Sequence, residues 1–118
     1  MSVTTFTVTV VSTDDGNKYF INGVRQDSVL LSRGGVYQFD QSDSSNENHP
    51  LRLSTTENGT HGGGSEYTTG VVTNGTPGNS GAYTQITVAS DAPSILFYYC
   101  SRHSGMGGSS YIGDSDFH

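Results

Sequence analysis

Short segments of β-branched and aromatic residues alternate with turn-forming residues along the whole chain. In the segment 3–11, Phe6, Val8 and Val10 fall on one face and threonines on the other, which is the pattern of a half-buried strand. Gly, Asn and Pro end such segments early, and none keeps a 3.6-residue period. A chain of 118 residues fits one hydrophobic core. The sequence therefore predicts a single all-β domain.

About eight short strands with turns between them predict an antiparallel sandwich or barrel. The segment 28–32 is expected to form a hairpin with 36–40 through a Gly-containing turn. The span 56–82 is long for a connection, so we expect it either to fold over the sheets or to carry a variable feature. The segments expected to be strands are 3–11, 18–21, 28–32, 36–40, 51–54, 66–72 at an edge, 83–88, 94–100 and 110–112.

Charge and composition exclude several classes of protein. The formal net charge of −6 argues against nucleic-acid binding and favours basic protein partners. The longest apolar runs are only a few residues, so no membrane span is expected. The first residues lack the pattern of a signal peptide, so either a leader has been removed or the protein is not exported by one. The single cysteine excludes an internal disulfide and leaves the redox compartment open.

A group of potential metal ligands follows the strongest strand segment, 94–100. Cys100, His103 and Met106 have the spacing C-x2-H-x2-M, and His49 ends a polar, turn-forming stretch before another predicted strand. Thiolate, imidazole and a weak thioether together suit copper that cycles between two oxidation states. These residues predict a mononuclear copper site built for electron transfer, with no catalytic residues.

Other interpretations of the same residues fit less well. Structural zinc sites prefer four strong ligands, usually with more thiolates, and a binuclear copper centre needs a second cysteine. A nucleophilic Cys100 would need a base and oxyanion donors, and no acid in the loop orients His103, so we expect no enzyme activity. Met106 is the weakest of the expected ligands, because axial thioethers are long and replaceable. His61, in a Gly-rich loop, and His118, near the end, are expected to be solvated.

With these ligands in this order, the chain resembles the cupredoxins, the small blue-copper proteins. In that family one loop between core strands supplies a His, and the loop between the last two strands supplies Cys, His and Met with a spacing that in amicyanin is similar to the one here. The resemblance implies a Greek-key β-sandwich of about eight strands over residues 1–113, with a tail at 114–118. It also implies a copper cofactor, one-electron transfer, and a monomeric carrier with a redox protein partner. The residues that match the ligand motif are His49, Cys100, His103 and Met106.

Two positions depart from the family pattern around the cysteine sulfur. Cupredoxins commonly have Asn after the first ligand His, with its backbone N–H pointing at the sulfur, whereas Pro50 has no N–H to give. Amicyanin and plastocyanin have Pro two residues after the cysteine, whereas Arg102 carries a backbone N–H there. We therefore expect one N–H···S hydrogen bond to be exchanged for another. Because such bonds tune the copper potential, the potential does not follow from the family.

The chain is also similar to cupredoxin-like modules of marine phage and bacterial proteins, which often sit within larger virion or surface proteins. The similarity lies in 37–46, 49–54 and 98–107. It leaves open a second function, a structural or adhesion module with or without bound metal. The location differs accordingly: the periplasm or extracellular space if a leader was removed, and the virion or host cell if the protein is phage-encoded.

Overall fold

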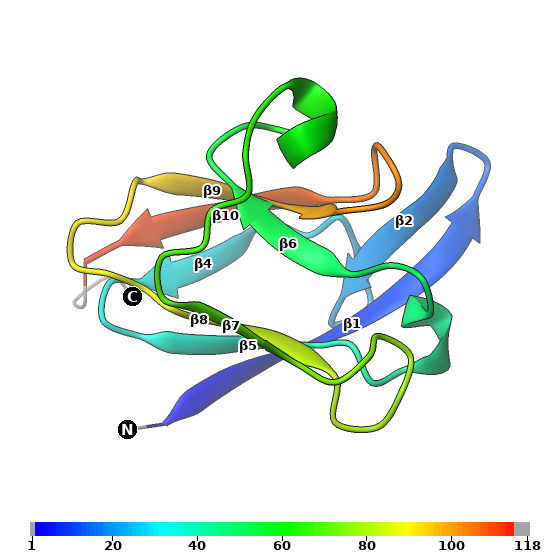
Figure 1. The fold of residues 1–118 in the computed structure, drawn as a ribbon, viewed down its shortest axis with the longest axis horizontal. Coiled ribbons are helices and arrows are strands. Elements are labelled where there is room, and N and C mark those ends of the chain that lie inside the picture. Colours follow the sequence, from blue (N-terminus) through cyan, green and yellow to red (C-terminus); the bar gives the residue numbers. More distant parts are fainter. Residues whose placement is uncertain (1, 115–118) are drawn as a thin grey trace.

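Two β-sheets pack face to face in the computed structural model, which describes residues 2–114 (Figure 1). Within that range the only helices are two short 3-10 turns, η1 (Ser44–Asn46) and η2 (Gly59–Gly62), and no helix is long and apolar enough to cross a membrane. The prediction of an all-β sandwich is confirmed. The strands are β1 (Val3–Thr13), β2 (Gly16–Ile21), β3 (Val24–Arg25), β4 (Val29–Ser32), β5 (Val36–Asp40), β6 (Leu51–Ser54), β7 (Val71–Asn74), β8 (Tyr83–Thr87), β9 (Ile95–Cys100) and β10 (Gly108–Gly113).

Both sheets contain parallel as well as antiparallel neighbours. One sheet has six strands in the order β3-β2-β1-β5-β8-β7, and the other has four in the order β4-β10-β9-β6. Strand β1 runs parallel to β5, and β4 runs parallel to β10, while the other pairs are antiparallel. The prediction of a purely antiparallel arrangement is therefore wrong for these two pairs. Alternation of apolar and polar residues indicates which face of a strand is buried, but not the direction of the neighbouring strand. The sequence pattern therefore did not distinguish parallel from antiparallel pairs.

The expected hairpin between the segments now seen as β4 and β5 is not formed. Leu31 of β4 pairs with Ile112 of β10 in the four-stranded sheet, whereas β5 lies in the other sheet beside β1. Gly34, at φ +87°, donates its N–H to Val88 O (2.7 Å), so the turn is held by the residue that follows β8. Leu31 and Phe39 are both fully buried in the same core. The chain therefore changes sheets at this turn, which lets both strands cover one core.

Boundaries differ from expectation at one edge and at the end of the chain. The edge strand expected at 66–72 is present at the sheet edge but spans Val71–Asn74. Asp114, the first residue of the expected tail, forms an ion pair with Arg33 at 3.1 Å. The rest of that tail, 115–118, and with it the last histidine, lies outside the described residues.

The candidate ligands sit at one end of the hydrophobic core. Its aromatic centre is Tyr98, whose ring centroid lies 6.0 Å from that of Phe39 and 6.3 Å from that of Tyr19. Full burial of an apolar side chain stabilises the fold by about 1.5–3 kcal/mol. Cys100 and Met106 belong to the same buried cluster, with 0% and 1% of their surface exposed. These two candidate ligands are thus part of the same core that stabilises the fold.

Candidate metal centre

Cys100 is the last residue of β9 and is held by strand pairing. It lies opposite Leu51 of β6 in the antiparallel ladder, and the next residue, Ser101, donates its backbone N–H to Pro50 O at 3.0 Å. The thiol is unpaired in any disulfide and fully buried. The position of the sulfur is therefore set by the sheet, and not by the loop that follows it.

His49 is fixed through its backbone by two buried polar side chains. Its carbonyl oxygen accepts hydrogen bonds from Tyr19 Oη (2.6 Å) and Gln41 Nε2 (2.7 Å). Gln41 is 1% exposed, and its Oε1 also accepts the backbone N–H of Leu51 at 2.9 Å. One glutamine therefore joins the residue before Pro50 to the residue after it, at the start of β6.

Asn46 completes this support from η1. Asn46 is fully buried and donates from Nδ2 to Val8 O (2.8 Å). Its backbone carbonyl oxygen accepts the His49 N–H at 2.8 Å. Asp43 caps η1 by accepting the Ser45 N–H at 3.1 Å, and its hydrogen bonds to Ser45 lower the pKa of the carboxyl. The loop before His49 is thus tied to β1 and to the core.

The ligand loop, residues 101–107, depends on contacts from other segments. Lys18 Nζ donates to Gly105 O at 2.8 Å, and the backbone N–H of Tyr19 donates to Met106 O at 3.0 Å. Gln26 Nε2 donates to Gly107 O at 2.8 Å. A side chain at Gly107 would place its Cβ 1.7 Å from a backbone oxygen, so only glycine fits there. This packing brings Met106 back into the core while His103 stays exposed.

Residues around η2 contact the ligand loop from the other side. Asn58 donates from Nδ2 to Ser104 Oγ (2.7 Å) and accepts the Gly105 N–H at Oδ1 (2.9 Å). His61 lies 2.8 Å, through Nε2, from the carbonyl oxygen of Cys100. This part of the long 56–82 span therefore folds over the sheets, which is one of the two arrangements expected for it. His61 is exposed and not a ligand, but it is hydrogen-bonded rather than simply solvated.

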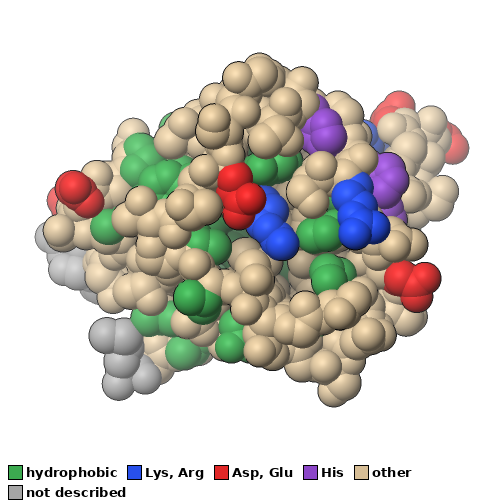
Figure 2. All heavy atoms as spheres, in the orientation of Figure 1, with side chains coloured by type: hydrophobic (Ala, Val, Ile, Leu, Met, Phe, Trp, Pro, Cys, Tyr) green, Lys and Arg blue, Asp and Glu red, His purple; other side chains and the backbone are tan. Residues whose placement is uncertain are grey.

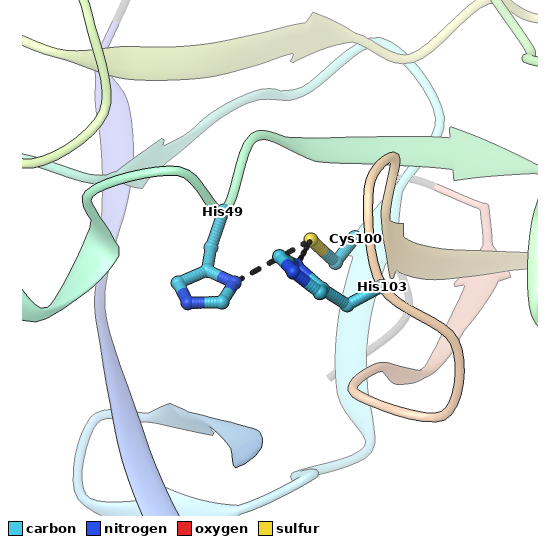
Figure 3. Close-up of side chains that lie close together, drawn as sticks. All are labelled: His49, Cys100 and His103. Atoms are coloured by element: carbon cyan, nitrogen blue, oxygen red, sulfur yellow. Dashed lines mark hydrogen bonds between the residues drawn. The ribbon is translucent and has the colours of Figure 1, made fainter.

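The structure brings three of the four expected ligands, His49, Cys100 and His103, together (Figure 3). Nδ1 of His49 lies 3.8 Å from Cys100 Sγ, and Nδ1 of His103 lies 3.6 Å from the same sulfur. All three ligand atoms lie within 4.8 Å of one another, and Met106 is part of the same cluster. Within residues 2–114 no other group of His, Cys, Asp and Glu residues has a comparable arrangement.

The spacing of these atoms fits a single metal ion. Metal–nitrogen and metal–sulfur bonds of about 2.0–2.3 Å, at angles between tetrahedral and trigonal, place two ligand atoms about 3.5–3.8 Å apart. The two S···N distances of 3.6 and 3.8 Å fall in this range. The two imidazole centroids are 4.6 Å apart and tilted by 49°, so both rings can face one point. The site is therefore a metal-binding arrangement.

The electrostatic surroundings favour the neutral form of the candidate ligand His49. Its burial lowers the pKa below the usual 6.5, and positive charge on His103 and Arg102 lowers it further. A neutral imidazole has the free lone pair that a metal needs. Burial, with a smaller contribution from Cys100, raises the pKa of Tyr19 well above its usual value, so its hydroxyl stays a donor to the His49 carbonyl.

The expected exchange of N–H···S hydrogen bonds is not present among the described residues. No backbone N–H within residues 2–114 donates to Cys100 Sγ, and the two candidate imidazole ligands lie 3.8 and 3.6 Å from it. The side chain of Arg102 instead donates to Asn48 Oδ1 at 3.3 Å, and so joins the ligand loop to the loop that carries His49. Asn48 adopts φ +68°, a conformation that asparagine tolerates better than most residues.

No protein-family model and no curated protein matches the chain. The sandwich and its His-Cys-His cluster, with a methionine within reach, are compatible with a cupredoxin-like fold. The identity of the metal and the function must therefore be inferred from the chemistry of the site.

Proposed function

We propose that this protein is a mononuclear type 1 copper protein that transfers single electrons. The observation that carries the proposal is the thiol of Cys100 held between the Nδ1 atoms of His49 and His103, at 3.8 and 3.6 Å, with Met106 buried in the same cluster. When bound, copper would supply a couple between Cu(II) and Cu(I).

The donor set supports copper over zinc. Cys100 is the only cysteine in the chain, so the thiolate-rich sets of most structural zinc sites cannot form. Met106 offers a soft, weak thioether, which suits Cu(I) and blue-copper sites. His49 and His103 provide the imidazoles that both oxidation states accept.

Each ligand makes a separate contribution to a carrier. Cys100 and His49 hold their positions through the sheet and the buried amides, which limits rearrangement when the charge of the site changes. Met106 is 1% exposed and belongs to the core cluster that contains Cys100, so it would supply a thioether from the core side. His103 is exposed and presents the site to a partner. The partner is a redox protein, and the net charge of −6 favours a basic one at long range.

Protein-film voltammetry tests this function. The copper-loaded protein is expected to give a reversible one-electron wave, and the zinc-loaded protein serves as the control without one. His49→Ala should abolish the wave because it removes a strong ligand. A protein that gains thermal stability from copper but shows no reversible wave would instead support the structural or adhesion module.

A further inference from the structure

The outer face of the six-stranded sheet carries a row of polar side chains. Phe39 of β5 and Thr84 of β8 are buried in the core, so the residues next to them, Asp40 and Tyr83, point outward. Asp40 and Tyr83 lie directly opposite each other in the antiparallel ladder, and Asn74 of β7 lies opposite Tyr83 on its other side. Three strands therefore place a carboxylate, a phenol and an amide side by side.

This row borders a surface pocket. The pocket has a volume of about 340 Å³, at the lower end of the range of about 300–1,000 Å³ that is usual for small-ligand sites. Gln38 also lines it, from two residues before Asp40 on the same face of β5, where its Nε2 donates to Gln85 Oε1 at 2.8 Å. The pocket is therefore small enough for one compact ligand and is bordered largely by hydrogen-bonding groups.

The loop after β7 forms one wall of the pocket and is held by hydrogen bonds. Asn74 Nδ2 donates to Gly81 O at 2.9 Å across the base of the loop. The backbone N–H of Gln41 donates to Ala82 O at 2.9 Å, and the backbone carbonyl of Gln41 accepts the Gly78 N–H at 2.8 Å. Gly81 and Ala82 line the pocket, so this wall is in place before a ligand arrives.

Several polar atoms around the pocket have no partner within residues 2–114. Ser42 donates its backbone N–H and its hydroxyl to Asp40 Oδ1, at 2.9 and 2.6 Å, which fixes the carboxylate and leaves Oδ2 unpaired in that range. Asn74 Oδ1 and Tyr83 Oη make no hydrogen bond there either. A carboxylate only accepts hydrogen bonds, whereas a phenol hydroxyl both donates and accepts. The matching ligand therefore carries donors as well as acceptors.

The charge around the pocket disfavours an anionic ligand. All five Lys and Arg residues of the chain lie within residues 2–114, and none of them lines the pocket, whereas Asp40 does. Figure 2 shows Lys and Arg side chains in the middle of the view and near the histidines, and none over the loop that follows β7, at the lower edge of the view.

We propose that this pocket binds one neutral pyranose ring of a sugar. Sugar hydroxyls both donate and accept hydrogen bonds, as the mixed set of carboxylate, amide and phenol requires. The C–H face of a pyranose is apolar and flat, so it can pack on the Tyr83 ring, which combines an apolar body with a polar tip. The inference goes beyond the proposed copper function and is independent of it, because Cys100 ends a strand of the other sheet.

Titration of the metal-free protein with simple glycosides, followed by proton–nitrogen correlation NMR, tests the proposal. The probes are methyl β-D-glucopyranoside and methyl β-D-galactopyranoside, which differ in the orientation of one hydroxyl. At least one of them should shift the amide signals of residues 38–42 and 81–85. Glycerol, which has hydroxyls but no ring, should leave these signals in place.

Two variants locate the binding. Asp40→Asn keeps an oxygen for the two hydrogen bonds from Ser42 but removes the charge, so affinity should fall about tenfold. Tyr83→Leu keeps apolar bulk but removes the ring and its hydroxyl, and should also weaken binding. Tyr111→Leu is the matched control and should bind as wild type does, because Tyr111 is 45% exposed on β10 of the other sheet. If Tyr83→Leu does not fold, Asp40→Asn decides.

Four results would overturn the sugar site. They are an absence of shifts with both glycosides, equal shifts with glycerol, undiminished affinity in Asp40→Asn, and an equal loss of affinity in Tyr111→Leu. Calcium chloride added in place of the glycosides covers a further case: shifts of the same amides with Ca²⁺ but not with sugar would assign the pocket to a cation. Since no copper is present, these results are separate from the voltammetry that tests the proposed function.

Discussion

The two candidate histidine ligands offer equivalent nitrogen atoms but are supported in opposite ways. The backbone of His49 is bonded by the buried side chain of Gln41 and by Tyr19, both inside the core. The loop that carries His103 is bonded by Lys18 and Asn58, which are partly exposed and come from distant segments. Loss of a buried partner leaves a polar group without water, whereas loss of an exposed partner is compensated by solvent.

Because of this difference, the His49 side contributes mainly to the stability of the fold, whereas the His103 side allows the ligand loop to move. The His49 side resists change because its polar groups have no alternative partners. The His103 side can move without unfolding the domain, because its bonds are exchangeable with water. We therefore expect substitutions on the first side to alter the free energy of unfolding, and substitutions on the second side to alter mainly the order of the ligand loop.

The largest effect is expected from Gln41→Leu. The change keeps the volume but leaves the buried N–H of Leu51 without its partner, which costs about 1–3 kcal/mol, and the His49 carbonyl loses one of its two donors. Urea unfolding of the metal-free protein, followed by circular dichroism, measures the loss. Gln38→Leu is the control, because Gln38 makes only a side-chain bond to Gln85 at 2.8 Å on the sheet. Equal losses in the two variants would contradict the comparison.

Asn58→Gly should have a smaller effect on stability and a specific effect on the ligand loop. Glycine accepts the φ of +64° at this position, so the change removes both hydrogen bonds without backbone strain. We expect a loss of about 1 kcal/mol in unfolding free energy, with faster amide exchange confined to residues 101–107. Ser104→Ala removes only one of the two bonds and should fall between wild type and Asn58→Gly. Unchanged exchange in the loop would show that Asn58 does not hold it.

The smallest effect concerns pH and the metal-free protein. Because the folded-state pKa of His49 lies below its unfolded value of 6.5, the unfolded state binds more protons as pH falls through that value. Stability from this residue is therefore present above about pH 6.5 and is lost as pH falls toward the folded pKa. Urea unfolding between about pH 7.5 and pH 5 measures it, since the carboxylates Asp15 and Asp43, whose pKa values are lowered, titrate at lower pH. His49→Gln should flatten this dependence, and an equally steep slope in that variant would assign it elsewhere.

The strands and the candidate ligand residues were predicted from local sequence patterns. Strands such as 36–40 and 51–54 were predicted with the bounds that the structure has, because alternation reports burial directly. Cys100, His103 and Met106 were identified by spacing within one loop, and the structure places His49 beside them. Copper as the metal, electron transfer and the partner stay predictions.

Features that depend on distant segments were not predictable in the same way. Gln41, Asn58 and His61 each act through one or two hydrogen bonds to residues far along the chain, and nothing in their neighbours marks these contacts. The polar composition around Gln41 instead resembles that of an exposed turn. The change of sheet between β4 and β5 also depends on which partner strands are available, namely β10 and β1, and this is decided only when the whole chain is assembled.

Titration of the metal-free protein with Cu(II), followed by visible absorption, tests the central claim most directly. The account predicts that one equivalent of Cu(II) gives an intense thiolate-to-copper band, because Cys100 Sγ lies beside both imidazole nitrogens. Cys100→Ser should lose the band, while Ser101→Ala, next to it in the chain, should keep it. A band that survives in Cys100→Ser, or no band in the wild-type protein at saturating Cu(II), would contradict the account.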